Sequence, residues 1–338
     1  MPPRKRDSVA VLGAGSFGTA LAVHLARLER PTWLWGRNAA HLRQLAADRV
    51  NEEYLPGVRF PPALQVAPDL KAAVARSHDI VVAVPSHALR DVVDALVPLL
   101  KDEEQGIVLA CKGLEPGTGR LPHEVVKEAL GTAHPLAVLS GPTFAKDIGQ
   151  GSPTGVTIAS PDQDYAEQVA RLFHGAGFRA YTSDDIVGVE VGGAVKNVLA
   201  IAVGAADGLG LGANTRTVLI TRGLAEIMRL GEALGANRDT LMGLSGIGDL
   251  VLTATDNQSR NRRFGLAIAQ GKTVEQAQAE IRQVVEGVRV APEVLRRAKQ
   301  LKVEMPITEQ VVAVLSGKVS PLEALRILAT RPSRAEMD

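Results

Sequence analysis

Residues 8–18 read Ser-Val-Ala-Val-Leu-Gly-Ala-Gly-Ser-Phe-Gly, and this stretch decides the fold. The apolar run Ser8–Leu12 predicts a buried strand. Phe17–Leu28 predicts a helix, because its large apolar residues recur at helical spacing. The turn between them carries a Gly-x-Gly-x-x-Gly pattern. Strand, glycine turn and helix in this order are typical of the first unit of a dinucleotide-binding sheet.

Each glycine of this turn has its own expected task. Gly13 permits the tight turn, Gly15 lets the backbone approach a pyrophosphate, and Gly18 lets the helix pack closely on the strand. The pyrophosphate is then expected at the positive end of the helix, where backbone N–H groups point outward. The alternative is a strand–turn–helix unit that binds no ligand.

The rest of the first half alternates short apolar runs with helical stretches. This alternation predicts an α/β fold with a doubly wound, Rossmann-type parallel sheet. The further strands are expected at Thr32–Trp35, Ile80–Val84, Ile107–Ala110, Leu136–Leu139, Val156–Ala159 and Arg179–Tyr181.

After about residue 188 the strand-like runs give way to long helical patterns. We therefore expect a dinucleotide-binding domain over residues 1–188 and an all-helical substrate domain over residues 189–338. The helices are expected at Glu190–Asp207, Thr215–Leu234, Arg262–Gln270, Thr273–Ile281, Ala291–Gln300, Ile307–Ser316 and Pro321–Ile327.

Composition narrows the class of protein. The chain has 338 residues, 46% of them hydrophobic, and a net charge of +1, so its charge gives no case for nucleic acid or membrane binding. Its apolar runs, such as Val198–Val203, are shorter than the roughly 18 residues of a membrane span. The single cysteine, Cys111, excludes an internal disulfide and is expected to be a buried small residue. We expect a cytoplasmic protein without membrane insertion and predict no metal site.

The end of the second strand bears on the choice of cofactor. Binders of NAD usually carry an acidic residue there for the ribose hydroxyl. This chain has Arg37 instead, and a guanidinium suits the 2′-phosphate of NADP. NADPH is therefore the preferred cofactor expected, with NADH as the second. Alternatively, Arg37 stacks on adenine or is a solvated surface charge.

Three later strand ends carry turn residues at the same predicted sheet edge, where ligands of such folds bind. They follow Val84, Ala110 and Leu139. Lys112, after the second of them, is a candidate contact for an anionic substrate.

The candidate for proton transfer is Lys196. Oxidation of an alcohol removes a hydride and a proton, and the protein must accept the proton. Lys196 lies in an otherwise uncharged helical stretch, and burial or a nearby cation such as Lys112 would lower its pKa. Asn197 can bind a carbonyl or hydroxyl oxygen through its amide. The alternative for Lys196 is a surface lysine.

Two further clusters complete the candidate site. Asp249 could bond the lysine or a substrate hydroxyl, and Thr253 would lie on the same helical face; alternatively, Asp249 is a helix N-cap. Ser259, Arg260 and Asn261 offer donors suited to a phosphorylated substrate, unless they simply start a basic surface helix.

Taken together, the motifs resemble those of the bacterial NAD(P)-dependent glycerol-3-phosphate dehydrogenases, over almost the whole chain. The matching stretches lie at 13–20, 34–37, 111–115, 139–145, 189–197, 207–212, 220–226, 246–253, 259–261 and 285–287. The resemblance implies reversible interconversion of sn-glycerol 3-phosphate and dihydroxyacetone phosphate, with Lys196 as the proton acceptor. It further implies a cytoplasmic enzyme, often a homodimer, that supplies precursor for membrane phospholipids.

The resemblance also implies individual contacts. Substrate contacts carry over to Lys112, Gly141, Thr143, Lys196, Asp249, Ser259, Arg260 and Asn261. Cofactor contacts carry over to Ser16, Phe17, Arg37, Tyr54, Lys112, Ala145, Arg260, Val284 and Glu286. Two other functions remain open, a β-hydroxyacid dehydrogenase and a dinucleotide-sensing protein without catalysis. In the former the asparagine usually follows the lysine by four residues, whereas here it is adjacent.

Overall fold

The computed structural model describes residues 8–101 and 104–332, and the chain divides into two compact units. Unit 1 contains the described residues up to Cys111 and then Pro122–Ile186. Unit 2 contains Lys112–Leu121 and the described residues from Val187 onward. A segment inside the sequence of the first half therefore packs with the second, which the predicted division at residue 188 did not anticipate. As a domain limit, that division stays a prediction.

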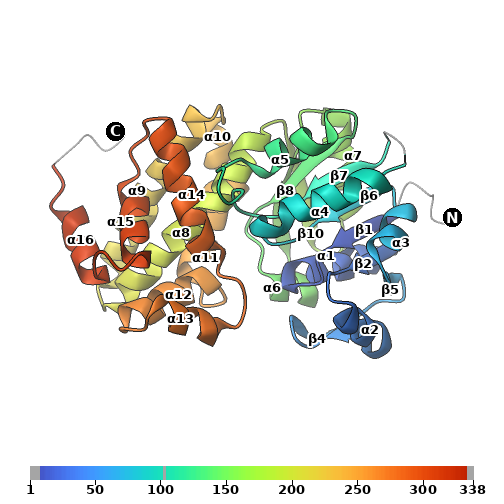
Figure 1. Ribbon diagram of the computed structural model, residues 1–338, viewed down its shortest axis with the longest axis horizontal. Helices are drawn as coiled ribbons and strands as arrows, with labels where there is room; N and C mark the ends of the chain where they lie inside the picture. Colours follow the sequence, from blue (N-terminus) through green and yellow to red (C-terminus); the bar gives the residue numbers. More distant parts are fainter. Residues whose placement is uncertain (1–7, 102–103, 333–338) are drawn as a thin grey trace. The chain divides into compact units, whose positions relative to one another are not determined.

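Unit 1 is built on a sheet with helices around it (Figure 1). Within the described residues, eight strands join in the order β10-β9-β8-β7-β6-β1-β2-β5. Their bounds are β1 Val9–Leu12, β2 Thr32–Trp35, β5 Leu64–Val66, β6 Asp79–Val82, β7 Gly106–Leu109, β8 Leu136–Ser140, β9 Thr154–Ala159 and β10 Phe178–Ser183. A separate antiparallel pair consists of β3 Val50–Asn51 and β4 Leu55–Arg59.

All seven predicted strands are present, and the sheet is predominantly parallel, as predicted, with one antiparallel pair. β8 and β9 pair antiparallel, with Val138 opposite Ala159, whereas the other neighbours in the sheet are parallel. The helix between β8 and β9, α6 Ala145–Gln150, has six residues. At 1.5 Å per residue it extends about 9 Å, too little to carry the chain back along a strand.

The sheet is covered on both faces, because every residue of β1, β6 and β7 is buried. α1 and α7 share one hydrophobic cluster with the sheet. Within the described residues, unit 1 contains seven α-helices. Their bounds are α1 Ser16–Arg27, α2 Ala39–Asp48, α3 Leu70–Ala75, α4 Leu89–Leu96, α5 Pro122–Leu130, α6 Ala145–Gln150 and α7 Gln163–Phe173, with short 3-10 turns at Ser86–Ala88 and Val97–Leu99.

Unit 2 is helical, as predicted, and is assembled around α8 Ile186–Gly208. The other helices are α9 Gly212–Ala233, α10 Arg238–Leu241, α11 Asp249–Thr255, α12 Arg260–Ala269, α13 Val274–Ile281, α14 Glu286–Gln300, α15 Pro306–Leu315 and α16 Pro321–Ala329. A π-helical turn, Leu244–Gly248, leads into α11.

α8, Ile186–Gly208, extends beyond the predicted helix Glu190–Asp207 at both ends. Its 23 residues suffice to cross a membrane by length and composition, and no other helix of the described chain does so. However, 89% of its apolar window is buried inside the protein. Core helices pass the same test of length and composition, and this burial is typical of a core helix.

Candidate active site

The glycine turn of unit 1 has the geometry that its spacing predicted. Gly13 has φ +120°, and a Cβ there would lie 2.4 Å from the carbonyl oxygen of Ala83. A Cβ on Gly18 would lie 1.9 Å from the carbonyl oxygen of Gly13, so only glycine permits this helix–turn approach. By contrast, a Cβ on Gly15 would meet nothing within 4 Å, which leaves open space beside the backbone.

One residue that supports this turn was missed. Asn51, from β3, is fully buried, and its side-chain amide donates to the carbonyl oxygen of Ala14 at 3.0 Å and to Thr19 Oγ1 at 2.8 Å. The two bonds that it donates lead to residues more than 30 positions away, so no local pattern could have indicated this role. Ser16 and Phe17 form the first turn of α1, which contains no acidic residue that would repel an anion.

Two of the predicted cofactor contacts, Arg37 and Tyr54, lie close to the ends of short strands in unit 1. Arg37 is exposed and lies two residues beyond the end of β2. Asn38 follows as the N-cap of α2, accepting the backbone N–H groups of Ala40 and His41. Tyr54 is half-buried, and its ring stacks on His41 with 5.5 Å between centroids.

Gly141, Thr143 and Ala145 follow β8 in unit 1. Gly141 has φ +147°, and a Cβ there would lie 2.9 Å from the carbonyl oxygen of Gly155. Thr143 Oγ1 donates to the carbonyl oxygen of Gly141 at 3.0 Å, which fixes the turn into α6 at Ala145. Cys111 is buried, as predicted.

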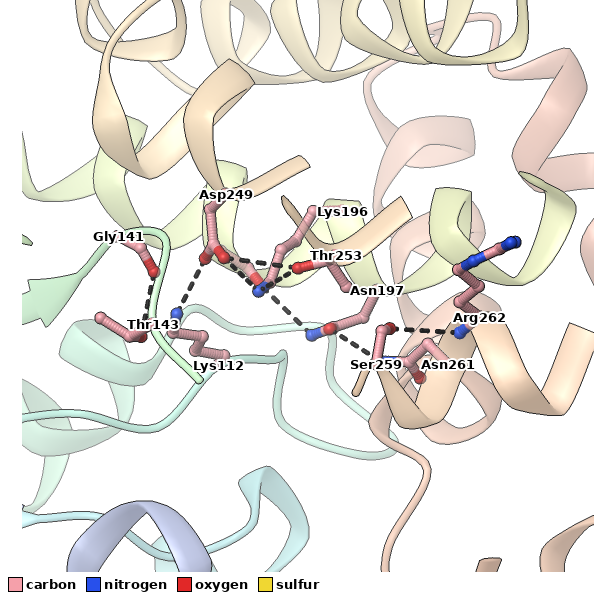
Figure 2. A network of polar contacts seen from close by, with 11 residues as sticks. Lys112, Gly141, Thr143, Lys196, Asn197, Asp249, Thr253, Ser259, Asn261 and Arg262 are labelled. Atoms are coloured by element: carbon pink, nitrogen blue, oxygen red, sulfur yellow. Dashed lines mark hydrogen bonds and ion pairs between the residues drawn. The ribbon is translucent and has the colours of Figure 1, made fainter. Parts of the chain in front are cut away.

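Two lysines and one carboxylate form the centre of the polar network in unit 2. Lys196 Nζ donates to Asp249 Oδ1 at 2.5 Å, and Lys112 Nζ donates to Asp249 Oδ2 at 2.8 Å. Figure 2 shows both ammonium groups directed at this carboxylate. The Asp249 side chain is fully buried, and 7% of the Lys196 side chain is exposed. The alternative of Lys196 as a surface lysine is therefore wrong.

Asp249 is the first residue of α11, and Gly248 occupies the N-cap position, so Asp249 is not itself the N-cap. Thr253, one helical turn later, accepts a hydrogen bond from Lys196 Nζ at 2.8 Å. Its hydroxyl lies 3.4 Å from Asp249 Oδ1, which places both residues on one helical face, as predicted.

The surroundings of Lys196 lower its pKa to about 7. Burial is the largest cause, because it penalises the charged form. The carboxylate of Asp249 opposes this effect, and the cation of Lys112 lowers the pKa further. A lysine amine near neutrality can accept or donate a proton at physiological pH.

A second chain of hydrogen bonds joins three helices. Asn261 Nδ2 donates to Asn197 Oδ1 at 2.8 Å, and Asn261 Oδ1 accepts the backbone N–H of Gly287 at 2.9 Å. Asn197 Nδ2 donates to the carbonyl oxygen of Gly193 at 3.2 Å. Both asparagine amides thus link α8, α12 and the start of α14. A Cβ on Gly287 would lie 2.5 Å from the carbonyl oxygen of Asn197, so this junction requires glycine.

The predicted donor cluster begins α12. Ser259 is its buried N-cap and accepts the backbone N–H of Arg262 at 3.2 Å. Arg260 is half-buried, and its Nη1 lies 3.4 Å from Gln283 Oε1. Burial lowers the pKa of Arg260, and Glu286, the first residue of α14, opposes that effect.

Arg262 differs from its neighbours, because it pairs with Asp207 at the end of α8 at 2.5 Å. The start of α12 is therefore anchored to α8 and is not a loose basic surface. Val284 is half-buried just before α14. No group of three His, Cys, Asp or Glu side chains that could hold a metal ion occurs among residues 8–101 and 104–332.

Comparison with known proteins identifies the family. The model of the NAD-dependent glycerol-3-phosphate dehydrogenase N-terminus matches residues 8–166, and that of the C-terminus of the same family matches residues 185–326. The chain belongs to this family. Glycerol-3-phosphate dehydrogenase [NAD(P)+] of Aliivibrio fischeri is 54% identical over 324 residues, which cover 95% of this chain and 94% of the relative. The enzyme of the same name from Shewanella frigidimarina is 53% identical over 97% of both chains.

A solved structure of glycerol-3-phosphate dehydrogenase from Coxiella burnetii agrees with this assignment. It matches with a TM-score of 0.94 and 44% identity, over 97% of this chain and all of that one. A D-mandelate dehydrogenase in complex with NADH and anilino(oxo)acetate shares the fold alone, with a TM-score of 0.64 and 12% identity. Membership of the glycerol-3-phosphate dehydrogenase family therefore argues against the hydroxyacid dehydrogenase alternative.

Proposed function

We propose that this protein transfers a hydride reversibly between NAD(P)H and dihydroxyacetone phosphate, giving sn-glycerol 3-phosphate, with Lys196 as general acid and base. The observation that carries this proposal is a buried lysine whose pKa is lowered to about 7 beside Asp249 and Lys112. Membership of the glycerol-3-phosphate dehydrogenase family supports the choice of substrate.

The residues of unit 1 fit a dinucleotide. The space beside Gly15 leaves room for a pyrophosphate at the start of α1, in the turn that Gly13 and Gly18 shape, where the backbone of Ser16 and Phe17 would hold it. When bound, the nicotinamide supplies or accepts the hydride. Tyr54, Ala145, Lys112, Arg260, Val284 and Glu286 are the further cofactor contacts in this proposal.

We assign the preference for NADPH to Arg37. Its exposed position two residues beyond β2 lets the guanidinium meet a 2′-phosphate without first being desolvated. The names of the relatives include both NAD and NADP, so NADH remains a usable cofactor. At least a tenfold higher kcat/KM with NADH would contradict the role of Arg37.

In this proposal the protein's own residues transfer the proton and bind the phosphate of the substrate. In the reductive direction the Lys196 ammonium donates its proton to the developing alkoxide, and in the oxidative direction the neutral amine accepts it. Asp249 and Thr253 hold the Lys196 nitrogen in place. Lys112 adds a positive charge that favours an anionic substrate. Binding of the phosphorylated substrate is proposed for Ser259, Arg260 and Asn261, together with Asn197, Gly141 and Thr143.

Steady-state kinetics with dihydroxyacetone phosphate and each cofactor test this proposal. The Lys196→Ala variant should bind NADPH but lose kcat by about 100-fold or more, the scale of general acid–base catalysis. Normal kcat in this variant would remove Lys196 from the mechanism. If the folded, cofactor-bound wild type turns over no dihydroxyacetone phosphate, the non-catalytic sensing function is favoured instead.

We further propose that the enzyme is a cytoplasmic homodimer that supplies glycerol 3-phosphate for membrane phospholipids. The resemblance to the bacterial enzymes supports both the assembly and the metabolic role. Light scattering of the purified protein gives its mass in solution. A mass near 35.7 kDa, that of one chain, would contradict the dimer.

A further inference from the structure

The segment Lys112–Leu121, which we call the strap, lies between two parts of unit 1 in the sequence but packs in unit 2. Leu114 and Leu121 are each 2% exposed and belong to the hydrophobic core of unit 2. The strap begins with Lys112, whose ammonium bonds Asp249 at 2.8 Å. Its conformation therefore determines whether this second cation stands beside Lys196.

The side chains of Glu293 and Arg296 on α14 hold the middle of the strap through contacts that we call the grip. Glu293 Oε1 accepts the backbone N–H of Gly117 at 3.1 Å, and Arg296 Nη1 donates to the carbonyl oxygen of the same residue. Arg296 Nη2 also donates to Glu293 Oε1 at 3.2 Å. An acid and a base one helical turn apart thus bind both polar groups of one glycine. Glu293 is only 6% exposed, and a buried carboxylate is costly unless such partners satisfy it.

The strap is also closed on itself. The backbone N–H of Gly119 donates to the carbonyl oxygen of Glu115 at 2.9 Å. The backbone N–H of Glu115 donates to the carbonyl oxygen of Arg120 at 2.9 Å. Gly117 has φ +81°, a conformation that residues other than glycine rarely adopt. This compact turn, together with the buried Leu114, connects the contacts at Gly117 to Lys112, five residues earlier in the chain.

We propose that Glu293 and Arg296 are positioning residues for proton transfer: they hold the strap so that Lys112 remains on Asp249 beside Lys196. This inference rests on the proposed function of Lys196. It gives α14 a second task besides presenting Glu286 at its start, because the grip on the strap lies two helical turns further along the same helix.

The Arg296→Ala variant tests the proposal. Arg296 is partly exposed, with 41% of its side chain accessible, so the variant should fold. We expect kcat to fall on the order of tenfold, the scale of one lost charge-assisted hydrogen bond, with KM for NADPH unchanged. The pH dependence of kcat/KM should move to higher pH, because a displaced Lys112 no longer lowers the pKa of Lys196. Arg296→Lys, which keeps a donor and a charge, should restore most of the activity.

Lys299→Ala is the matched control. It removes an exposed positive charge one helical turn beyond Arg296 on α14 and should leave both the rate and the pH dependence unchanged. Glu293→Gln supplies a second variant, which removes the charge but keeps an acceptor for Gly117. An unchanged kcat and pH profile in both Arg296→Ala and Glu293→Gln would overturn the proposal. So would a change confined to KM for NADPH.

Hydrogen exchange separates this inference from the function on which it rests. In Arg296→Ala, backbone amides in the strap should exchange on the order of tenfold faster than in Lys299→Ala, whether or not the enzyme turns over its substrate. Unchanged exchange would show that α14 does not hold the strap. Faster exchange in a protein whose wild type fails to reduce dihydroxyacetone phosphate would refute the function and leave the grip on the strap intact.

Discussion

Replacing Lys112 by methionine is expected to move the pH dependence of catalysis to higher pH. The Lys112 and Lys196 ammonium groups bond the two oxygens of one carboxylate, at 2.8 and 2.5 Å. Methionine has a similar length but no charge. The variant loses the repulsion that Lys112 exerts on the Lys196 ammonium. In addition, the Asp249 carboxylate then interacts with Lys196 and no longer with Lys112, so it stabilises the Lys196 ammonium more strongly. Both effects raise the pKa of Lys196.

The size of this rise follows from Coulomb's law. Two like unit charges about 4 Å apart repel by about 4 kcal/mol where the effective dielectric constant is about 20. A change of one in pKa corresponds to about 1.4 kcal/mol. The Lys112 side chain is 15% exposed, so solvent screens part of the repulsion. We therefore expect the pKa of Lys196 to rise from about 7 by about one to two pH units.

The assay is kcat/KM against pH in both directions. Oxidation of glycerol 3-phosphate requires the neutral Lys196 amine, so its rate rises as pH increases through the pKa. Reduction of dihydroxyacetone phosphate requires the ammonium, so its rate falls through the same pKa. In Lys112→Met the pH midpoints of both kcat/KM profiles should move to higher pH by the same amount. Midpoints that stay in place, or move to lower pH, would refute the charge coupling, whatever happens to the maximal rate.

The control for this experiment is Lys272→Met. Lys272 pairs with Glu280 at the surface of unit 2, and 38% of its side chain is exposed. This variant removes one positive charge without touching Asp249. Its pH midpoints should coincide with those of the wild type. A movement equal to that of Lys112→Met would mean that net charge, and not the contact with Asp249, sets the pKa.

Three further outcomes are expected. Arg260→Ala should raise KM for dihydroxyacetone phosphate on the order of tenfold or more, as lost charge-assisted bonds to phosphate require; an effect on the cofactor alone would reassign this residue. Gly287→Ala should lower the free energy of unfolding by about 1–3 kcal/mol in urea titration, because its Cβ would lie 2.5 Å from a backbone oxygen; an unchanged midpoint argues against a tight junction. Glu226→Ala should cost about 2–4 kcal/mol, measured by thermal unfolding. The variant leaves the buried backbone N–H groups of Ile307 and Thr308 without their acceptor, and a wild-type melting temperature would contradict the expected loss of stability.

Much of the fold could be predicted because its signals are local. The spacing of Gly13, Gly15 and Gly18 and the apolar run before them express constraints within a few residues. The seven predicted strands are all present, and Asp249 and Thr253 share a helical face because residues four apart always do. β5 was missed because it has three residues, and β4 because Pro56 and Gly57 interrupt its pattern.

The amino-acid sequence by itself determined which chemical groups are present, where most of the regular elements lie, and to which family the chain belongs. Only the tertiary structure brought Lys112 and Lys196 to one carboxylate, across sequence separations of 137 and 53 residues from Asp249. It also assigned the strap to unit 2 and reversed the direction of β9. The physical reason is that periodicity and turn chemistry act over a few residues, whereas desolvation and charge coupling depend on all the atoms that packing brings around a group.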